Sequence, residues 1–175
     1  KLPELPRFGM RMELHQPYEN LTYYGRGPFE NYIDRYSGAF IGRYEDKVEN
    51  QFYWYIRPQE TGNKTDVRWL TLLDSGGLGV KITGLQPISF SALHFSPEDL
   101  DPGLTRKLQH TIDIVPQKNI FLHVDLKQRG LGGDNSWGMY PHNEYRLLDK
   151  KYTYSYMIEL VEKGSDKNDY LNSRK

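Results

Sequence analysis

Phe8-Gly9-Met10-Arg11-Met12-Glu13-Leu14 alternates large apolar residues with small or charged ones. Successive side chains of a β-strand point to opposite faces, so this alternation predicts a half-buried strand. Short apolar and aromatic runs recur along the chain between clusters of Gly, Pro, Asn and Asp, which is the pattern of further strands. These runs predict strands at residues 20–24, 51–56, 67–73, 79–83, 88–93, 110–115, 120–126 and 152–160.

Only one segment has the pattern of a helix. Ser96 is a good N-cap, Pro97 suits the first helical position, and two acidic residues follow. Pro102-Gly103 limits this helix to about one turn. Many short strands and almost no helix predict an all-β sandwich or barrel, and we see no fixed-period repeat of the kind that forms propellers. We expect one β-sandwich domain over residues 1–162 and a polar, frayed tail at 163–175.

Composition narrows the classes of partner and site. The chain has 175 residues, with 23 Lys and Arg against 23 Asp and Glu, so its balanced charge gives no support for nucleic acid as a partner. It contains no cysteine, which excludes disulfides and thiolate metal sites. No apolar run approaches the roughly 20 residues of a membrane span, so we expect no membrane partner. The absence of an initiating Met predicts a piece of a longer protein, and the compartment stays open between a bacterial cytoplasm and periplasm.

The loop Gly130-Leu131-Gly132-Gly133-Asp134-Asn135-Ser136-Trp137 combines three glycines, three small polar residues and a tryptophan. Glycine reaches backbone angles closed to other residues, so we expect a sharp bend. Such a bend could present the indole of Trp137 to a ligand or tuck it into the core, and composition leaves both alternatives open.

The chain shows no motif for catalysis of its own. Its five histidines have no metal-ligand spacing, and the glycine-rich loop does not open a helix as a phosphate loop would. Carboxylates near each other in sequence, such as Glu30 and Asp34, are more often paired with arginine than used as an acid and base pair. Taken together, loops 25–35, 58–68 and 130–137 carry aromatic rings and Asp, Asn and Arg side chains, a combination that favours binding of a sugar.

Four segments together resemble the C-terminal domain of family 2 glycoside hydrolase β-galactosidases. The sequence GRGPFENYIDR at 25–35 is similar to that domain's G-x-G-P-x-E-N-Y-x-D-R, and PQETG at 58–62 to its P-Q-E-x-G loop with a downstream arginine. GGDNSWG at 132–138 resembles G-G-D-[DN]-S-W-[GS], and LPRFG at 5–9 resembles L-P-R-[IV]-G. The order and spacing also match, over about residues 5–160.

The resemblance implies an antiparallel β-supersandwich of the galactose mutarotase-like class, here the small-chain, C-terminal part of a longer domain. It also implies that the two catalytic glutamates lie on a TIM-barrel domain, so this chain should be inactive alone. The implied partners are a β-galactoside sugar and the TIM-barrel domain, and uncovered strand edges would favour a homo-oligomer. The implied Mg²⁺ and Na⁺ sites belong to other domains of the parent enzyme, and this chain would hold no cofactor.

The resemblance also assigns residue roles. Trp137 would be the aromatic platform on the aglycone side of the bound sugar. Its supporting loop would comprise Gly132, Gly133, Asp134, Asn135 and Ser136, and the last three would brace the platform. A structural network is expected from the remaining polar residues of these segments rather than direct sugar contact. Its members would be Glu30, Asp34, Arg35, Glu60 and Arg68.

Two further hypotheses remain at this stage. The chain could be an independent carbohydrate-binding module, which needs no other domain. By fold analogy alone it could be an aldose mutarotase-like enzyme, which needs a histidine or acid pair to move a proton to and from the sugar. His94, His110 and His123 are the candidates for that role, and none lies in a matched motif.

Overall fold

The computed structural model describes residues 4–101, 103, 109–135 and 137–162. They form a seven-stranded antiparallel sheet in the order β1-β6-β5-β4-β2-β3, with β7 pairing with β5. The strands are β1 Arg7–Leu14, β2 Asn20–Gly27, β3 Phe40–Lys47, β4 Lys64–Leu73, β5 Gly79–Leu93, β6 Ile120–Gln128 and β7 Tyr156–Val161. The helical segments are α1 Pro97–Leu100 and the 3-10 turns η1 Val48–Asn50, η3 Thr111–Asp113 and η4 Asn143–Tyr145.

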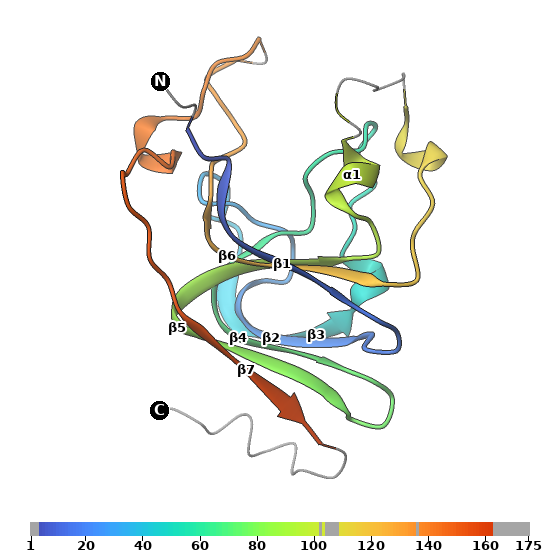
Figure 1. Ribbon diagram of the computed structural model, residues 1–175. Helices are drawn as coiled ribbons and strands as arrows, with labels where there is room; N and C mark the ends of the chain where they lie inside the picture. The colour runs from blue at the N-terminus through green and yellow to red at the C-terminus, as the bar shows by residue number, and fades with distance from the viewer. Residues whose placement is uncertain (1–3, 102, 104–108, 136, 163–175) are drawn as a thin grey trace.

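The long strand β5 bends and folds the sheet into two layers (Figure 1). Its first part pairs with β7, and its last part, Ser89 to Leu93, pairs with β6. The bend falls near Gly84, where a Cβ would lie only 2.3 Å from the carbonyl oxygen of Gln86. The upper layer therefore holds β1, β6 and the end of β5, and the lower layer holds β2, β3, β4, β7 and the start of β5. This arrangement confirms the all-β sandwich.

The main hydrophobic core fills the space between the two layers. Its fully buried side chains come from alternate positions of β2, β4, β5 and β6, for example Leu70, Ile82 and Leu122. Met12 and Leu14 of β1 pack against it, as their alternation with charged residues predicts. A second, smaller cluster lies among the loops and joins Phe52, Leu93, Phe95, Leu100 and Ile114.

Most predicted elements are confirmed, and a few are wrong. Strands at 8–14, 20–24, 67–73 and 120–126 are present, and the capping box of Ser96 and Asp99 begins α1. Residues 51–56 form no strand, and 110–115 contain the turn η3. The two strands predicted within 79–93 are one, and the strand predicted from 152 begins at Tyr156. β3 has no counterpart among the predicted strands, and the tail at 163–175 lies outside the described residues.

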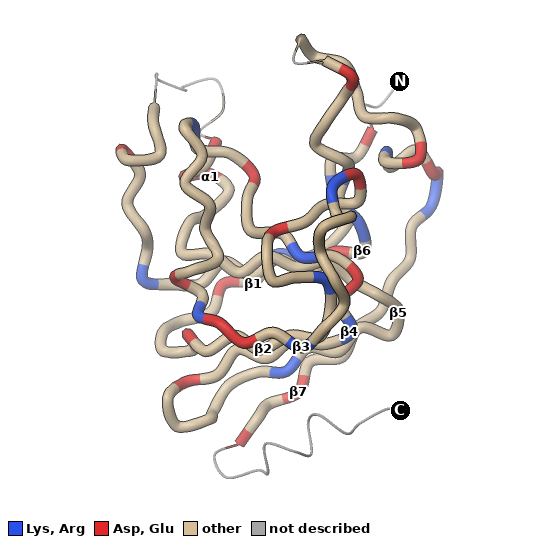
Figure 2. The backbone as a smooth tube through the Cα atoms, turned by 180° about the vertical axis from the view of Figure 1, so that it is seen from behind, with Lys and Arg blue, Asp and Glu red and all other residues tan. Residues whose placement is uncertain are grey.

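Long loops rise from the upper layer on the side away from the main core. In Figure 1 the segment after β6 climbs on one side, and α1 with the segment that precedes β6 climbs on the other. Acidic and basic residues are interspersed along the trace, and neither sign gathers in one region (Figure 2). No helix in the described part of the chain is long and apolar enough to cross a membrane.

Candidate functional site

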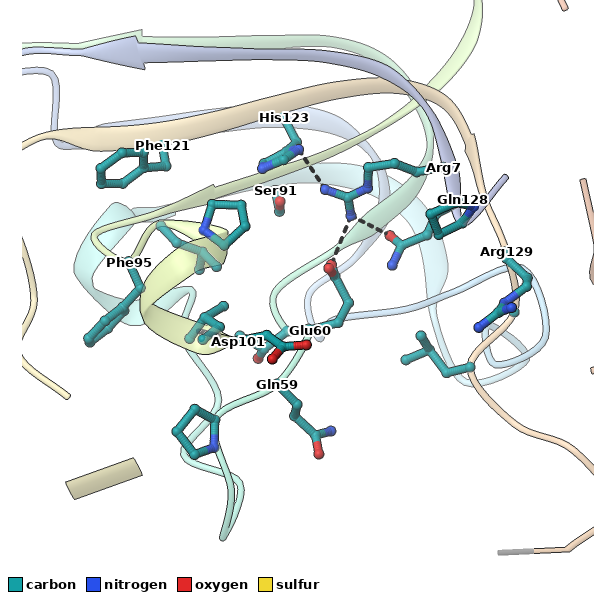
Figure 3. A pocket seen from close by; sticks show the side chains of 18 residues that line it. Arg7, Gln59, Glu60, Ser91, Phe95, Asp101, Phe121, His123, Gln128 and Arg129 are labelled. Atoms are coloured by element: carbon teal, nitrogen blue, oxygen red, sulfur yellow. Dashed lines mark hydrogen bonds and ion pairs between the residues drawn. The ribbon is translucent and has the colours of Figure 1, made fainter. Parts of the chain in front are cut away.

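A pocket of about 630 Å³ lies between these loops, on the outer face of the upper layer. Its floor is the sheet itself, from the start of β1 and the facing parts of β5 and β6. Three segments form its walls: residues 58–61, residues 95–101 in and next to α1, and residues 128–131 at the base of the loop that carries Trp137. Figure 3 shows the lining side chains converging from all three sides.

Arg7 is the centre of the polar side of this pocket (Figure 3). Its Nη2 donates to Oε1 of Glu60 at 3.1 Å and to Oε1 of Gln128 at 2.9 Å. Its Nη1 lies 2.5 Å from Nδ1 of His123, and its Nε lies 3.4 Å from Oδ2 of Asp125. The start of β1 is thereby tied to β6 and to the loop of the PQETG segment.

The contact with Arg7 fixes the proton position on His123. A guanidinium can only donate, so Nδ1 of His123 accepts and the neutral ring carries its proton on Nε2. Burial, reinforced by the positive charges of Arg7 and Arg11, lowers the pKa of His123 to about 4. His123 is therefore neutral near pH 7 and can donate one hydrogen bond, through Nε2.

Asp125 is a buried carboxyl with few partners. It is 1% exposed, and neither carboxyl oxygen has a hydrogen-bond partner among the described residues. Burial raises its pKa to about 6, although Arg7 opposes the rise. The side chain fits because Gly9 faces it across a bulge between β1 and β6, and a Cβ there would lie 1.8 Å from Oδ1 of Asp125. Burial also raises the pKa of Glu60.

Of the five residues expected to form a network, Glu30 and Arg35 come together. The side chain of Glu30 is 4% exposed and accepts from Nη2 of Arg35 at 2.6 Å and from the backbone N–H of Gly62 at 2.7 Å. The hydroxyls of Thr61 and Tyr55 also donate to it. Glu30 therefore joins the loop before β3 to the two segments that precede β4.

The other three residues have separate partners. Oδ2 of Asp34 accepts the backbone N–H of Gly132 at 2.8 Å, which pins the Trp137 loop to the 25–35 segment. Glu60 pairs with Arg7 in the pocket. Arg68 donates to the backbone carbonyl of Asp66, in β4, and contacts neither Glu30 nor Glu60 in the described network.

Trp137 is not a core residue, because it is 92% exposed. Its backbone N–H donates to Oδ1 of Asn135 at 2.8 Å, which closes the turn before it. Oδ1 of Asp134 lies 2.7 Å from Nε2 of His142, and this contact raises the pKa of His142. Ser136 lies outside the described residues.

Two of the three glycines in this loop are needed because neighbouring atoms leave no room for a side chain. The sequence had suggested a different reason, backbone angles that other residues cannot adopt. Gly130, Gly132 and Gly133 all avoid the left-handed region. A Cβ on Gly130 would lie 2.8 Å from the carboxyl group of Asp34, and one on Gly133 would lie 2.3 Å from the carbonyl oxygen of Met139. Only at Gly132 is there room, because the nearest atom would be 3.7 Å away.

Sequence reasoning missed the polar floor of the pocket. The expected site residues did not include Arg7 or Gln128, which line the pocket, or the buried Asp125 next to Arg7, and His123 was only one of three candidate histidines. One signal was available, because Phe121, His123 and Asp125 alternate with buried apolar residues on β6. Both faces of that strand are therefore covered, and the polar face is the pocket side. No group of three or more His, Asp or Glu in the described residues could hold a metal ion.

Comparison with known proteins points to one family. The sequence matches the family described as the β-galactosidase small chain over residues 1–158. It is 38% identical over 159 residues to a β-galactosidase of Priestia megaterium and 37% identical over 160 residues to one of Streptococcus thermophilus, in each case over 90% of this chain and 15% of the relative. A β-galactosidase of Halalkalibacterium halodurans is 36% identical over 147 residues, covering 83% of this chain and 14% of its own. The chain thus spans about a seventh of the length of these relatives.

Proposed function

The chain belongs to the β-galactosidase small-chain family, and from that premise we propose that it is a non-catalytic, C-terminal part of an enzyme that hydrolyses terminal β-D-galactosides. Its contribution to the reaction would be an aromatic surface at the active site of the whole enzyme. The catalytic glutamates would lie on a TIM-barrel domain of the whole enzyme. That domain would also be the part of the enzyme that this chain contacts.

The exposure of Trp137 is the observation that carries this proposal. The indole is 92% exposed next to the exposed Met139 and Tyr140, and a group of exposed apolar side chains of this kind marks an interaction site. A sugar ring presents C–H groups that pack on an aromatic face, and a rigid platform binds better than a mobile one. The hydrogen bond from Gly132 to Asp34 supplies part of that rigidity. We assign Trp137 to the aglycone side of the site.

The carboxylates of the pocket support a non-catalytic role. Glycoside hydrolysis needs two carboxyl groups roughly 5–10 Å apart, on either side of an accessible glycosidic bond. Glu60 lines the pocket and is held by Arg7, whereas Asp125 is 1% exposed and does not line the pocket, so these two carboxyl groups do not flank an accessible glycosidic bond. The mutarotase alternative needs a proton donor near pH 7, and His123 is neutral there.

The exposed apolar side chains support a role within a larger protein. Met139 and Tyr140 are exposed beside Trp137, and Phe40 on the edge strand β3 is also exposed. We propose that Met139 and Tyr140 face the TIM-barrel domain. We also propose that exposed strand edges, such as that of β3, take part in a homo-oligomer. Any Mg²⁺ or Na⁺ of the parent enzyme would lie on its other domains.

The test is a kinetic comparison of two tryptophan variants in the full-length enzyme. Stacking of this kind contributes about 0.5 to 1.5 kcal/mol, so Trp137→Ala should raise KM for lactose about two- to twelvefold. Trp54→Ala is the matched control, because Trp54 is also exposed but lies on the loop before β4. Equal kinetics for the Trp137→Ala enzyme and the wild type would refute the platform role.

A further inference from the structure

The pocket above β1, β5 and β6 has one apolar side and one polar side (Figure 3). Phe95 and Phe121 lie on the apolar side, next to Leu93 and Leu100. Arg7 and Gln128 lie opposite them. A lining that is apolar on one side and hydrogen-bonding on the other suits a molecule with the same division, such as a sugar ring with its C–H face and its hydroxyls.

Two polar groups on the floor of the pocket have no internal partner. Ser91 and His123 face each other in the β5–β6 ladder, and both line the pocket. Neither the hydroxyl of Ser91 nor Nε2 of His123 makes a hydrogen bond to a described residue, since Arg7 occupies only Nδ1 of the ring. Buried polar groups are normally satisfied, so these two are available to a ligand with hydroxyl groups.

The charges of the pocket point to a neutral ligand. The guanidinium of Arg7 is matched by Glu60 at 3.1 Å and by Asp125 at 3.4 Å. Arg129 at the rim is matched by Glu4 at 2.9 Å. An anion would find each of these cations already paired, and the pocket carries acidic groups that would repel it.

We propose that this pocket is a second sugar-binding site of the chain, which takes a neutral sugar of one or two rings in addition to any sugar that meets Trp137. Its volume of about 630 Å³ lies within the ~300–1,000 Å³ of small-ligand pockets. The sugar stacks its C–H face on the Phe95 and Phe121 side, while Ser91 and Nε2 of His123 bind its hydroxyls. The site does not depend on the role assigned to Trp137, because the two groups of residues are different.

The two sites share one structural element. Gly130 and Leu131 line the pocket, and both belong to the loop that carries Trp137. The backbone N–H of Gly130 donates to the carbonyl oxygen of Tyr145, so the base of the loop is fixed on the pocket side. A sugar that contacts Leu131 therefore rests against the same loop.

The first experiment locates the sugar. Crystals of the full-length protein are soaked in D-galactose, and parallel crystals in D-galactose 6-phosphate. We expect galactose density between Phe121 and His123, and none there for the phosphorylated sugar. Binding of the phosphate ester at this place with equal occupancy would overturn the neutral-ligand argument. A pocket filled by another segment of the protein, or holding only water at saturating galactose, would overturn the proposal.

The second experiment titrates the full-length enzyme with galactose by calorimetry and fits two classes of site, because the active site of the whole enzyme also binds galactose and only the second class belongs to the pocket. His123→Phe keeps a flat ring and removes the Nε2 donor, so the pocket affinity should fall about tenfold or more. His94→Phe is the control, because His94 is partly buried but bonds to Glu19 and Asn119 away from the pocket. Leu131→Trp narrows the rim at an exposed position and should also weaken binding. Unchanged affinity in both His123→Phe and Leu131→Trp would overturn the assignment.

Discussion

Adding a single methyl group at Gly133 should displace Trp137, whereas the same change one residue earlier should be tolerated. A Cβ on Gly133 would lie 2.3 Å from the carbonyl oxygen and 2.8 Å from the Cβ of Met139. A Cβ on Gly132 would meet nothing closer than 3.7 Å. Neither glycine is in the left-handed region, so alanine adds no backbone strain at either position. The two variants therefore differ only in the space around the added methyl group.

The size of the effect follows from this geometry. Non-bonded heavy atoms rest about 3.5 to 4.0 Å apart, so the chain at Gly133 and Met139 must separate by roughly 1 Å or more. Overpacking of this kind costs about 1 to 3 kcal/mol. Met139 follows Trp137 by two positions, so the separation moves the indole as well. A misplacement of about 1 Å can lower the rate up to about a hundredfold.

The assay is steady-state hydrolysis of lactose by the full-length enzyme, with thermal unfolding recorded for each variant. Gly133→Ala should lower kcat/KM about ten- to a hundredfold. Gly132→Ala should stay within about twofold and gain a little stability, because alanine restricts the unfolded chain. Equal kinetics for the two variants would refute the reasoning, as would a loss confined to Gly132→Ala.

Three other variants test separate parts of the structure. Asp34→Ala removes the acceptor of the Gly132 N–H. The Gly132 amide should then exchange with deuterium about five- to thirtyfold faster, which corresponds to about 1 to 2 kcal/mol for this exposed hydrogen bond. Asp134→Ala is the control and should leave the exchange rate unchanged. Glu30→Ala should lower the free energy of unfolding, measured by urea titration, by about 3 kcal/mol, because Gly62 and Arg35 lose a buried acceptor. Glu45→Ala is the control at an exposed ion pair and should change the free energy of unfolding by about 0.5 kcal/mol or less. Asp125 has its pKa raised to about 6, so the folded state holds a proton more tightly than the unfolded state; the stability this contributes is complete below pH 3.8 and is lost as pH rises to 6. Asp125→Asn should therefore become more stable relative to the wild type as pH rises from 4 to 7, by on the order of 2 kcal/mol, and a pH-independent difference between the two would show that the carboxyl does not titrate in this way.

Local patterning was enough for most of the strands. The alternation of Met10, Met12 and Leu14 with polar residues could be read directly, because one face of β1 meets the core and the other does not. β3 lacks such a pattern. It is an edge strand whose side chains are mostly exposed, so no apolar face marks it.

Aromatic composition misled the prediction at 51–56. The rings there pack on each other and on the small cluster, with Phe52 4.3 Å from Phe95 between ring centroids, while the backbone runs as a loop. Strand propensity reports how well a side chain packs, and it does not distinguish a loop that packs equally well. In β5 the opposite error occurred. Two strands were predicted, at 79–83 and 88–93, but Gly84 and Pro87 between them lie where a single strand bends and its ladder with β4 is interrupted.

The two parts of the candidate site also differ in how far the sequence predicts them. The Trp137 loop could be found because its residues are contiguous and resemble a known motif. The pocket could not, since Arg7, Glu60, Ser91 and His123 come from separate parts of the chain and meet only when β5 folds the sheet. No spacing in a sequence encodes that meeting, because it depends on the register of three strands and the path of a loop.

The central claim is that Trp137 forms part of a galactoside site whose catalytic groups lie elsewhere in the protein. A crystal structure of the full-length enzyme with a bound, slowly hydrolysed galactoside tests it most directly. The account predicts the indole of Trp137 in van der Waals contact with the aglycone, at about 4 Å, and the catalytic glutamates on another domain. An indole far from the bound galactoside, or a reacting carboxylate supplied by residues 4–162, would contradict it.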